Sequence, residues 1–189
     1  VGMIGGFSGN NSNLDEIRVG DSFADVAPTG APNMPPTANA GGPYVIKEGD
    51  ALALDGSASD DPDMDSLSFR WDLDNDGNYG EAGEPTTETP SVSWATLQTF
   101  GIDDDSGGPY TIGLQVDDGK GGVATATTTV TVNNTAPVLS TTGSGTVSAG
   151  SSYTLNLSAT DPGADTISSW TINWGDGAIE TFAGNPASV

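Results

Sequence analysis

Short stretches in which apolar and polar residues alternate predict that the chain folds mainly into β-strands. The clearest of these stretches are Leu67–Trp71, Tyr110–Val116 and Val123–Val132. A shorter one covers Ala51–Leu54. A period of two places the apolar side chains on one face of a strand, and turn residues bound each run. Several short strands separated by turns are typical of an antiparallel β-sandwich, so the predicted fold class is all-β.

One stretch departs from this pattern and predicts a helical turn at Trp94–Phe100. Ser93 is of the residue type that caps a helix N-terminus, and Gly101 is of the type that ends one. We expect Trp94 to pack this insertion against the sandwich.

Two proline-containing seams divide the chain. The first, residues 27–36, reads as a linker after an N-terminal tail of residues 1–26, and the second lies at residues 133–137. Residues 37–133 have the length of one sandwich domain, and residues 134–189 are expected to form a second, incomplete one. The chain opens at Val1 without a signal-peptide pattern, so we expect it to be an internal piece of a longer or processed protein.

A weak repeat relates the residues that follow the two seams. An Asn-x-x-Pro segment, an Asp-Pro-x-x-Asp turn and a tryptophan recur in the same order. The matched pairs are Asn33 with Asn134, Asp61 with Asp161, Asp65 with Asp165, and Trp71 with Trp174. This order predicts two tandem domains of one family, with both tryptophans in the centres of core strands.

The charge of the chain excludes whole classes of partner. Acidic residues outnumber basic ones 26 to 4, for a net charge of -22. Such a surface repels phosphate backbones and anionic membranes, so we expect no nucleic-acid partner. No run of 18 apolar residues is present, so no membrane insertion is expected.

Histidine and cysteine are both missing from the sequence. Their absence removes Ser-His-Asp and Cys-His nucleophilic systems, thiolate zinc sites and disulfides. We therefore expect no enzymatic activity. Oxygen ligands remain abundant, because 20 of the 26 acidic residues are aspartates.

The first acidic cluster contains Asp61, Asp63 and Asp65, which alternate on a predicted turn. Carboxylates this close repel one another unless a cation lies between them. Calcium takes six to eight oxygen ligands in irregular geometry, which suits the edge of a sandwich. The alternative interpretation is a solvated acidic turn.

The second cluster contains Asp72, Asp74, Asp76 and Gly77, spaced as at positions 1, 3, 5 and 6 of an EF-hand loop. No helix is expected on either side, and position 12 is a glycine. Another acidic residue nearby, Glu81 or Glu84, could supply the missing ligand. The alternative is a hairpin turn whose aspartates cap their own backbone.

Several of these motifs together resemble the polycystic kidney disease (PKD) domain, an immunoglobulin-like β-sandwich. They are the Trp174–Gly177 motif (WGDG), the Asp-Pro-x-x-Asp turn, and Val116–Gly122, which is similar to the last hairpin of that family. The first copy resembles a longer variant, with Trp71–Gly77 in place of the shorter motif. The resemblance covers residues 35–189. Residues Asn13–Gly20 separately resemble the closing strand of a laminin-G or concanavalin-like lectin domain.

The resemblance implies a ligand set for calcium. In PKD modules of bacterial collagenases the ion is held by a linker asparagine, two aspartates of an Asp-x-Asp turn and an aspartate near the last hairpin. The matching residues here are Asn33, Asp61, Asp63 and Asp118, with Asp117 as an alternative. In the second copy Asn134, Asp161 and Asp165 repeat the pattern, but Gly163 replaces the middle aspartate, so we expect a weaker site or none.

These observations favour a non-catalytic, calcium-stabilised stalk, spacer or adhesion module at the cell surface or outside the cell, in a large bacterial protein. Its partners would be neighbouring domains or copies of the same protein. One alternative is a filament subunit completed by a donor strand, for which Leu14–Val19 is the candidate. Another is a module that binds polysaccharide beside a secreted hydrolase, which would require exposed, coplanar tryptophan or tyrosine rings.

Overall fold

The computed structural model describes residues 32–104, 107–163 and 165–189. Its contacts divide the chain into Val1–Pro32 and Asn33–Val189. The predicted tail, the candidate donor strand Leu14–Val19 and the lectin-like stretch Asn13–Gly20 all lie outside the described residues.

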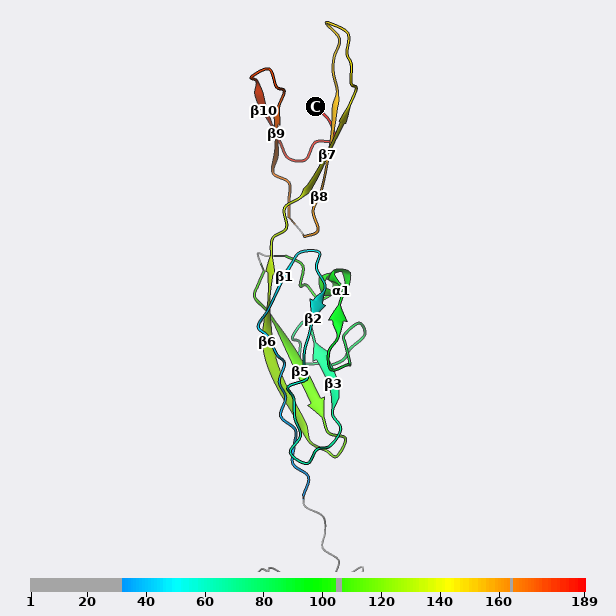
Figure 1. Ribbon diagram of the computed structural model, residues 1–189, viewed down its shortest axis with the longest axis vertical. Helices are drawn as coiled ribbons and strands as arrows, with labels where there is room; N and C mark the ends of the chain where they lie inside the picture. The colour runs from blue at the N-terminus through cyan, green and yellow to red at the C-terminus, as the bar shows by residue number, and fades with distance from the viewer. Residues whose placement is uncertain (1–31, 105–106, 164) are drawn as a thin grey trace, which may run out of the picture. The chain divides into compact units, whose positions relative to one another are not determined.

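The described residues form ten strands and one short helix (Figure 1). In chain order they are β1 Tyr44–Lys47, β2 Leu52–Ala53, β3 Ser68–Asp72, β4 Ser91–Val92, α1 Trp94–Thr99, β5 Tyr110–Asp117, β6 Val123–Asn133, β7 Val138–Gly143, β8 Leu155–Thr160, β9 Ser169–Asn173 and β10 Ile179–Ala183. The alternating runs of the sequence correspond to β2, β3, β5 and β6, so the all-β prediction is confirmed.

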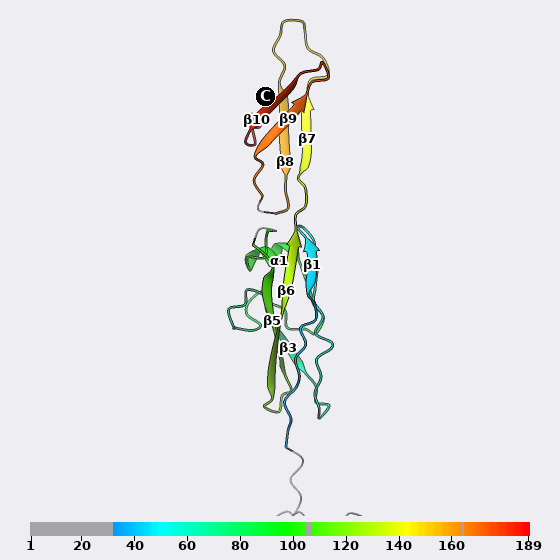
Figure 2. The same cartoon turned by 90° about the vertical axis from the view of Figure 1, so that its left-hand side faces the viewer.

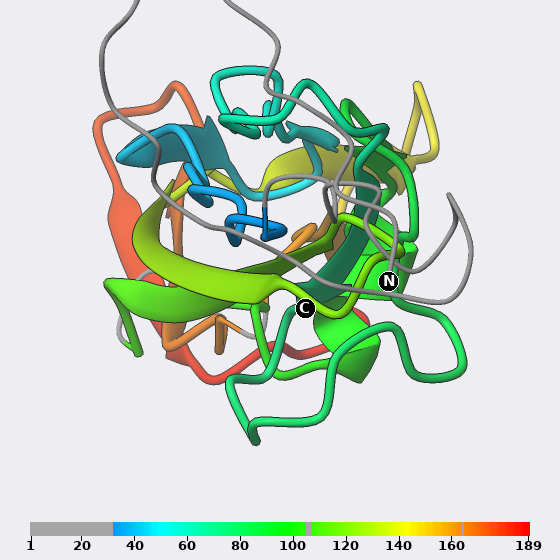
Figure 3. The same ribbon diagram turned by 90° about the horizontal axis from the view of Figure 1, so that it is seen from below.

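A four-stranded sheet in the order β1-β6-β5-β3 forms one layer of the sandwich, and the pair β2-β4 packs against it across the core (Figures 1 and 2). Strands β3, β5 and β6 are antiparallel, whereas β1 joins the edge of β6 in parallel. Figure 3 shows β5 and β6 side by side from below. The parallel pairing places the ends of β1 and β6 together, with Lys47 opposite Asn133.

Strand β5 shows how the alternation builds the core. Ile112, Leu114 and Val116 are fully buried on its inner face, and Leu114 lies opposite Trp71 of β3, which is also fully buried. The Trp71 indole donates a 2.9 Å hydrogen bond to the Thr87 carbonyl. Its large ring therefore fills the core without leaving a buried donor unpaired.

The predicted helical turn is confirmed. The Ser93 side chain accepts a hydrogen bond from the Thr96 amide at the start of α1, and Leu97 is fully buried. The helix ends before Gly101, whose positive φ of 73° favours glycine. Among the described residues, no helix is long and apolar enough to cross a membrane.

Residues 134–189 form two hairpins, β7-β8 and β9-β10, and the last residues of the chain pair with β8. Among the described residues of this segment, the buried apolar side chains are Leu157 and Trp170. The prediction that Trp174 occupies a core strand is wrong. Trp174 lies just after β9 and is 38% exposed, whereas Trp170 within β9 is 6% exposed. Period-two alternation along β9 turns the side chain of Trp170 inward.

Candidate metal sites

Three groups of carboxylates lie close enough to share a cation, each group having one oxygen per residue within 4.8 Å of the others. Among the residues that the structure describes, they are Asp61, Asp63 and Asp65; Asp72, Asp74 and Glu84; and Glu48, Asp161 and Asp165. Two unit charges at this separation repel by roughly 3 kcal/mol at an effective dielectric constant of about 20. Each group therefore costs stability unless protons, hydrogen-bond donors or a cation offset the repulsion.

In the first group, the Asp61 carboxylate organises the turn that carries the other two aspartates. Its Oδ1 accepts hydrogen bonds from the amides of Asp63 (2.8 Å) and Asp65 (3.2 Å). Asp61 is only 4% exposed, and its Oδ2 is buried without a hydrogen-bond partner. A buried anionic oxygen that lacks a donor is costly, and a cation shared with Asp63 and Asp65 would remove that cost.

The segment entering the sandwich closes over this turn. The Met34 amide donates a 2.6 Å hydrogen bond to Asp63 Oδ2. The neighbouring Asn33 side-chain amide donates to Asp118 Oδ2 at 2.8 Å, while Asp118 Oδ1 accepts from the Gly122 amide at 2.9 Å. The hydrogen bond from Asn33 is the main reason that the pKa of Asp118 lies below its ordinary value.

The structure thus divides the ligand set implied by the resemblance. Asp61, Asp63 and Asp65 gather in one group, and Asn33 and Asp118 bond to each other beside it. Asp117 instead accepts a hydrogen bond from the Gly119 amide within its own turn. The three grouped aspartates and the unpaired Asp61 oxygen fit a hard divalent cation such as calcium.

The second group lies in the loop after β3. Asp72 is 1% exposed, and its two oxygens accept from the amides of Asp76 (3.2 Å) and Gly77 (2.9 Å). Gly77 has a positive φ of 91°, so the loop requires glycine there. Asp76 is outside the carboxylate group, and its side chain instead accepts from the Asn78 amide and side chain.

Glu84 completes this group, which makes it the more suitable of the two glutamates considered for the missing ligand. It is 8% exposed and accepts hydrogen bonds from the amides of Leu73 (2.6 Å), Gly80 (3.0 Å) and Glu81 (3.0 Å). Burial raises the pKa of Glu84, and the charge of Asp72 raises it further, against the effect of the three amides. The aspartates of the loop also cap their own backbone, as the alternative interpretation expects.

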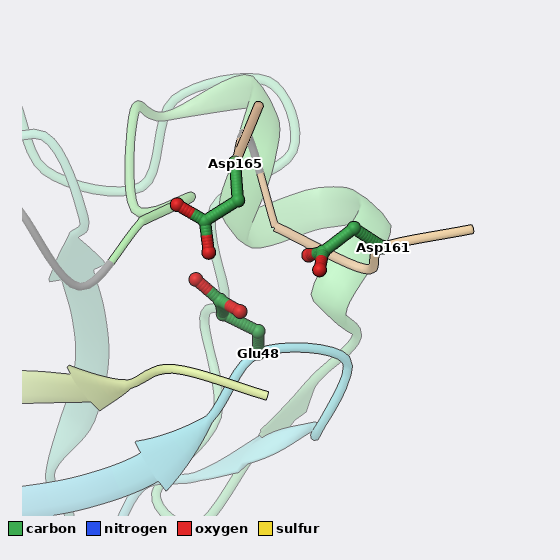
Figure 4. Close-up of side chains that lie close together, drawn as sticks. All are labelled: Glu48, Asp161 and Asp165. Atoms are coloured by element: carbon green, nitrogen blue, oxygen red, sulfur yellow. The ribbon is translucent and has the colours of Figure 1, made fainter. Parts of the chain in front are cut away.

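The sequence motifs predict only two members of the third group, Asp161 and Asp165. Figure 4 shows Asp161 and Asp165 on one turn, with the side chain of Glu48 extending toward them from the end of β1. Asn134, the remaining residue predicted for this site, is exposed. Glu48 lies outside both acidic motifs, so sequence reasoning missed it.

Comparison with known proteins identifies the family. A family model described as PKD domain matches residues 33–132, more than half of the chain. A search of curated proteins gives no match. Among solved structures, the chain is similar to a nucleoside hydrolase-related hypothetical protein from Saccharophagus degradans that is associated with carbohydrate metabolism, at 19% identity and a TM-score of 0.38.

That alignment covers 53% of this chain and 26% of the other, so the chain spans about a quarter of that structure. A likeness this slight has no bearing on fold or function. The matched residues form the sandwich and include the buried Trp71 and the turn at Asp61. The chain belongs to the PKD domain family.

Proposed function

We propose that residues 33–189 are a non-catalytic structural or adhesion module of an extracellular or cell-surface protein, stabilised by calcium at the Asp61–Asp63–Asp65 group. PKD domains are immunoglobulin-like modules of this kind. The strongly acidic surface is compatible with an environment rich in divalent cations. As a spacer, the module would act through neighbouring domains or copies of the same protein.

The observation that carries this proposal is the buried Oδ2 of Asp61, which has no hydrogen-bond donor. The backbone satisfies Oδ1 through two amides but not Oδ2, and one carboxylate oxygen of Asp61 lies within 4.8 Å of carboxylate oxygens of Asp63 and Asp65. A calcium ion would satisfy the oxygen and offset the repulsion among the three carboxylates.

Thermal unfolding in calcium and in a chelator tests the proposal. An ion that binds only the folded state at a hundred times its Kd adds about 2.7 kcal/mol of stability. For a domain of about 100 residues, such as the sandwich of residues 37–133, that corresponds to a rise in melting temperature of about 10–20 °C. An unchanged melting temperature after complete chelation would refute the proposal.

Asp63→Asn should remove most of the calcium-dependent rise, because it deletes a charged ligand on an exposed turn without opening a core cavity. Asp60→Asn is the matched control. Asp60 is an exposed aspartate next to Asp61 but outside the carboxylate group, so its variant should keep the full response.

The polysaccharide-binding alternative gains no support from the exposed aromatic pair of the C-terminal segment. Tyr153 and Trp174 are 39% and 38% exposed, but their rings meet edge-on at an interplanar angle of 83°. The Trp174 indole also donates to Glu180 at 3.1 Å. This pair does not offer the flat, coplanar surface on which sugar rings stack.

A further inference from the structure

We propose that Glu48 supplies the carboxylate that the Asp161 turn lacks, so that a calcium ion bound by Glu48, Asp161 and Asp165 connects the sandwich of residues 37–133 to the segment that follows it. This second site goes beyond the proposed function, because its ligands come from two successive parts of the chain. It does not depend on calcium at the Asp61 group.

The sheet holds Glu48 at the point where the chain leaves the sandwich. Glu48 directly follows β1, and its amide donates to the carbonyl of Asn133, the last residue of β6, at 3.1 Å. Two further hydrogen bonds come from Thr135, whose amide donates to Glu48 Oε2 at 2.9 Å and whose hydroxyl donates to the Glu48 carbonyl at 3.0 Å. Two residues of the second seam, Asn133 and Thr135, therefore hold the Glu48 backbone, and the Thr135 amide also positions its carboxylate.

The position taken by Glu48 corresponds to that of Asp63 in the first group. There, Asp63 Oδ2 accepts a hydrogen bond from the amide of Met34, the residue after Asn33. At the second seam, residues 133–137, Glu48 Oε2 accepts from the amide of Thr135, the residue after Asn134. In the Asn-x-x-Pro repeat, Met34 and Thr135 occupy the same place, so two carboxylates from different parts of the chain accept from equivalent amides.

Gly163 explains why Glu48 can take this place. It stands where the first turn has Asp63, and its amide donates to Asp161 Oδ1 at 3.0 Å, as the Asp63 amide donates to Asp61 Oδ1. A Cβ atom at Gly163 would collide with the carboxylate of Glu48. The missing side chain thus leaves the space that the Glu48 carboxylate fills.

Unpaired buried oxygens indicate that this group requires a cation. Glu48 is 3% exposed, and its Oε1 is buried without a hydrogen-bond partner. Asp161 Oδ2 is also buried and unpartnered. Two anionic oxygens of one group that both lack donors, with Asp165 beside them, form an oxygen-only site that suits calcium.

A local reporter is already present at this site. The indole of Trp94 donates a 2.8 Å hydrogen bond to the carbonyl of Pro162, between Asp161 and Gly163. The chain has four tryptophans, so fluorotryptophan labelling gives few 19F resonances, and Trp94→Phe assigns the one at the seam. A calcium titration of the full chain followed by 19F NMR then measures binding at the seam, and calorimetry measures the total number of ions.

Glu48→Gln is the decisive variant, because it removes the charge while its remaining oxygen can still accept from Thr135. We expect the calcium midpoint of the Trp94 resonance to rise at least tenfold and calorimetry to lose one site. Asp63→Asn should leave that midpoint unchanged. A Trp94 midpoint that Glu48→Gln shifts by less than twofold, or a Trp94 resonance that does not respond to calcium in the unmodified chain, would overturn the proposal.

A pair of substitutions tests whether the Glu48 carboxylate occupies the space that a side chain at position 163 would fill. Glu48→Ala empties the position, and adding Gly163→Asp places a carboxylate within the turn, as in Asp63. Gly163 does not have the positive φ that would disfavour aspartate. The double variant should bind calcium at the seam at least fivefold more tightly than Glu48→Ala alone, and equal affinities would contradict the proposal.

The two proposals fail separately. Loss of one ion in Asp63→Asn with none lost in Glu48→Gln would support the proposed function and refute the seam site. The converse result would support the seam site and refute calcium binding at the Asp61 group.

Discussion

Replacing Glu84 by alanine should destabilise the sandwich even without calcium, because its carboxylate is the acceptor for three loop amides. The three amides differ in what the loss of this acceptor costs them. The Gly80 amide also donates to the Trp71 carbonyl at 2.8 Å, and Glu81 is exposed, so water can replace its partner. Leu73 is 1% exposed, and its amide has Glu84 as its acceptor in the structure.

The expected cost is therefore dominated by one buried donor. A buried N–H left without an acceptor costs about 1–3 kcal/mol, so we expect Glu84→Ala to lower the free energy of unfolding by roughly 2–3 kcal/mol. Glu84→Gln keeps one acceptor oxygen and loses a charge that repels Asp72. Its cost should be smaller, about 1 kcal/mol.

Urea unfolding in a chelator at pH 7, followed by tryptophan fluorescence, measures these differences. Glu81→Ala is the matched control, because it removes an exposed glutamate side chain from the same loop and leaves the backbone amide in place. We expect the control to lie within about 0.5 kcal/mol of the unmodified chain. If Glu84→Ala lies within the same range as the control, the assignment of Glu84 as the organising acceptor is refuted.

The pH dependence gives a second readout for Glu84. Because burial raises its pKa in the folded state, the folded chain binds this proton more tightly than the unfolded chain does. Its contribution to stability is fully present below the ordinary glutamate pKa and is lost as the pH rises through the raised value. The cost of Glu84→Gln should therefore be largest near pH 4 and decrease toward pH 7.

Three further predictions concern the sandwich itself. Leu114→Ala, in the fully buried centre of β5, should cost about 3–5 kcal/mol in urea unfolding, and a loss below 1 kcal/mol would contradict its place in the core. Ser93→Ala should cost about 1 kcal/mol by removing the side-chain acceptor of the Thr96 amide, whereas Ser93→Asp, which keeps a side-chain acceptor, should cost less. Asn33→Ala should lessen the depression of the Asp118 pKa, so its destabilisation should be present at neutral pH and disappear as acid protonates Asp118; a loss that is constant with pH would refute this account.

Local patterns in the sequence were sufficient for strands β2, β3, β5 and β6, for the capped helix and for the aspartates of two acidic groups. Period-two alternation identifies β3, β5 and β6 because each strand has one buried face. Ser93 and Gly101 mark the helix ends because capping involves only nearby residues. The clusters at Asp61 and Asp72 were visible because their ligands are close together in the sequence.

Tertiary structure decided which side chains complete these sites. Glu84 joins Asp72 only because the loop folds back so that three amides meet its carboxylate. Trp170 rather than Trp174 is buried because the pairing of β9 with β10 determines which residues lie within the strand. The sequence repeat alone does not determine how β9 pairs with β10.

Glu48 is the clearest case of a residue that the sequence alone did not reveal. It belongs to neither acidic motif, and its carboxylate accepts a hydrogen bond from the amide of Thr135, which lies 87 positions later. Parallel pairing of β1 with β6 brings the two together at the seam, and the missing side chain of Gly163 leaves room for the carboxylate. Contacts of this kind depend on how distant strands pair, whereas a pattern along the chain records only which face of each strand is buried.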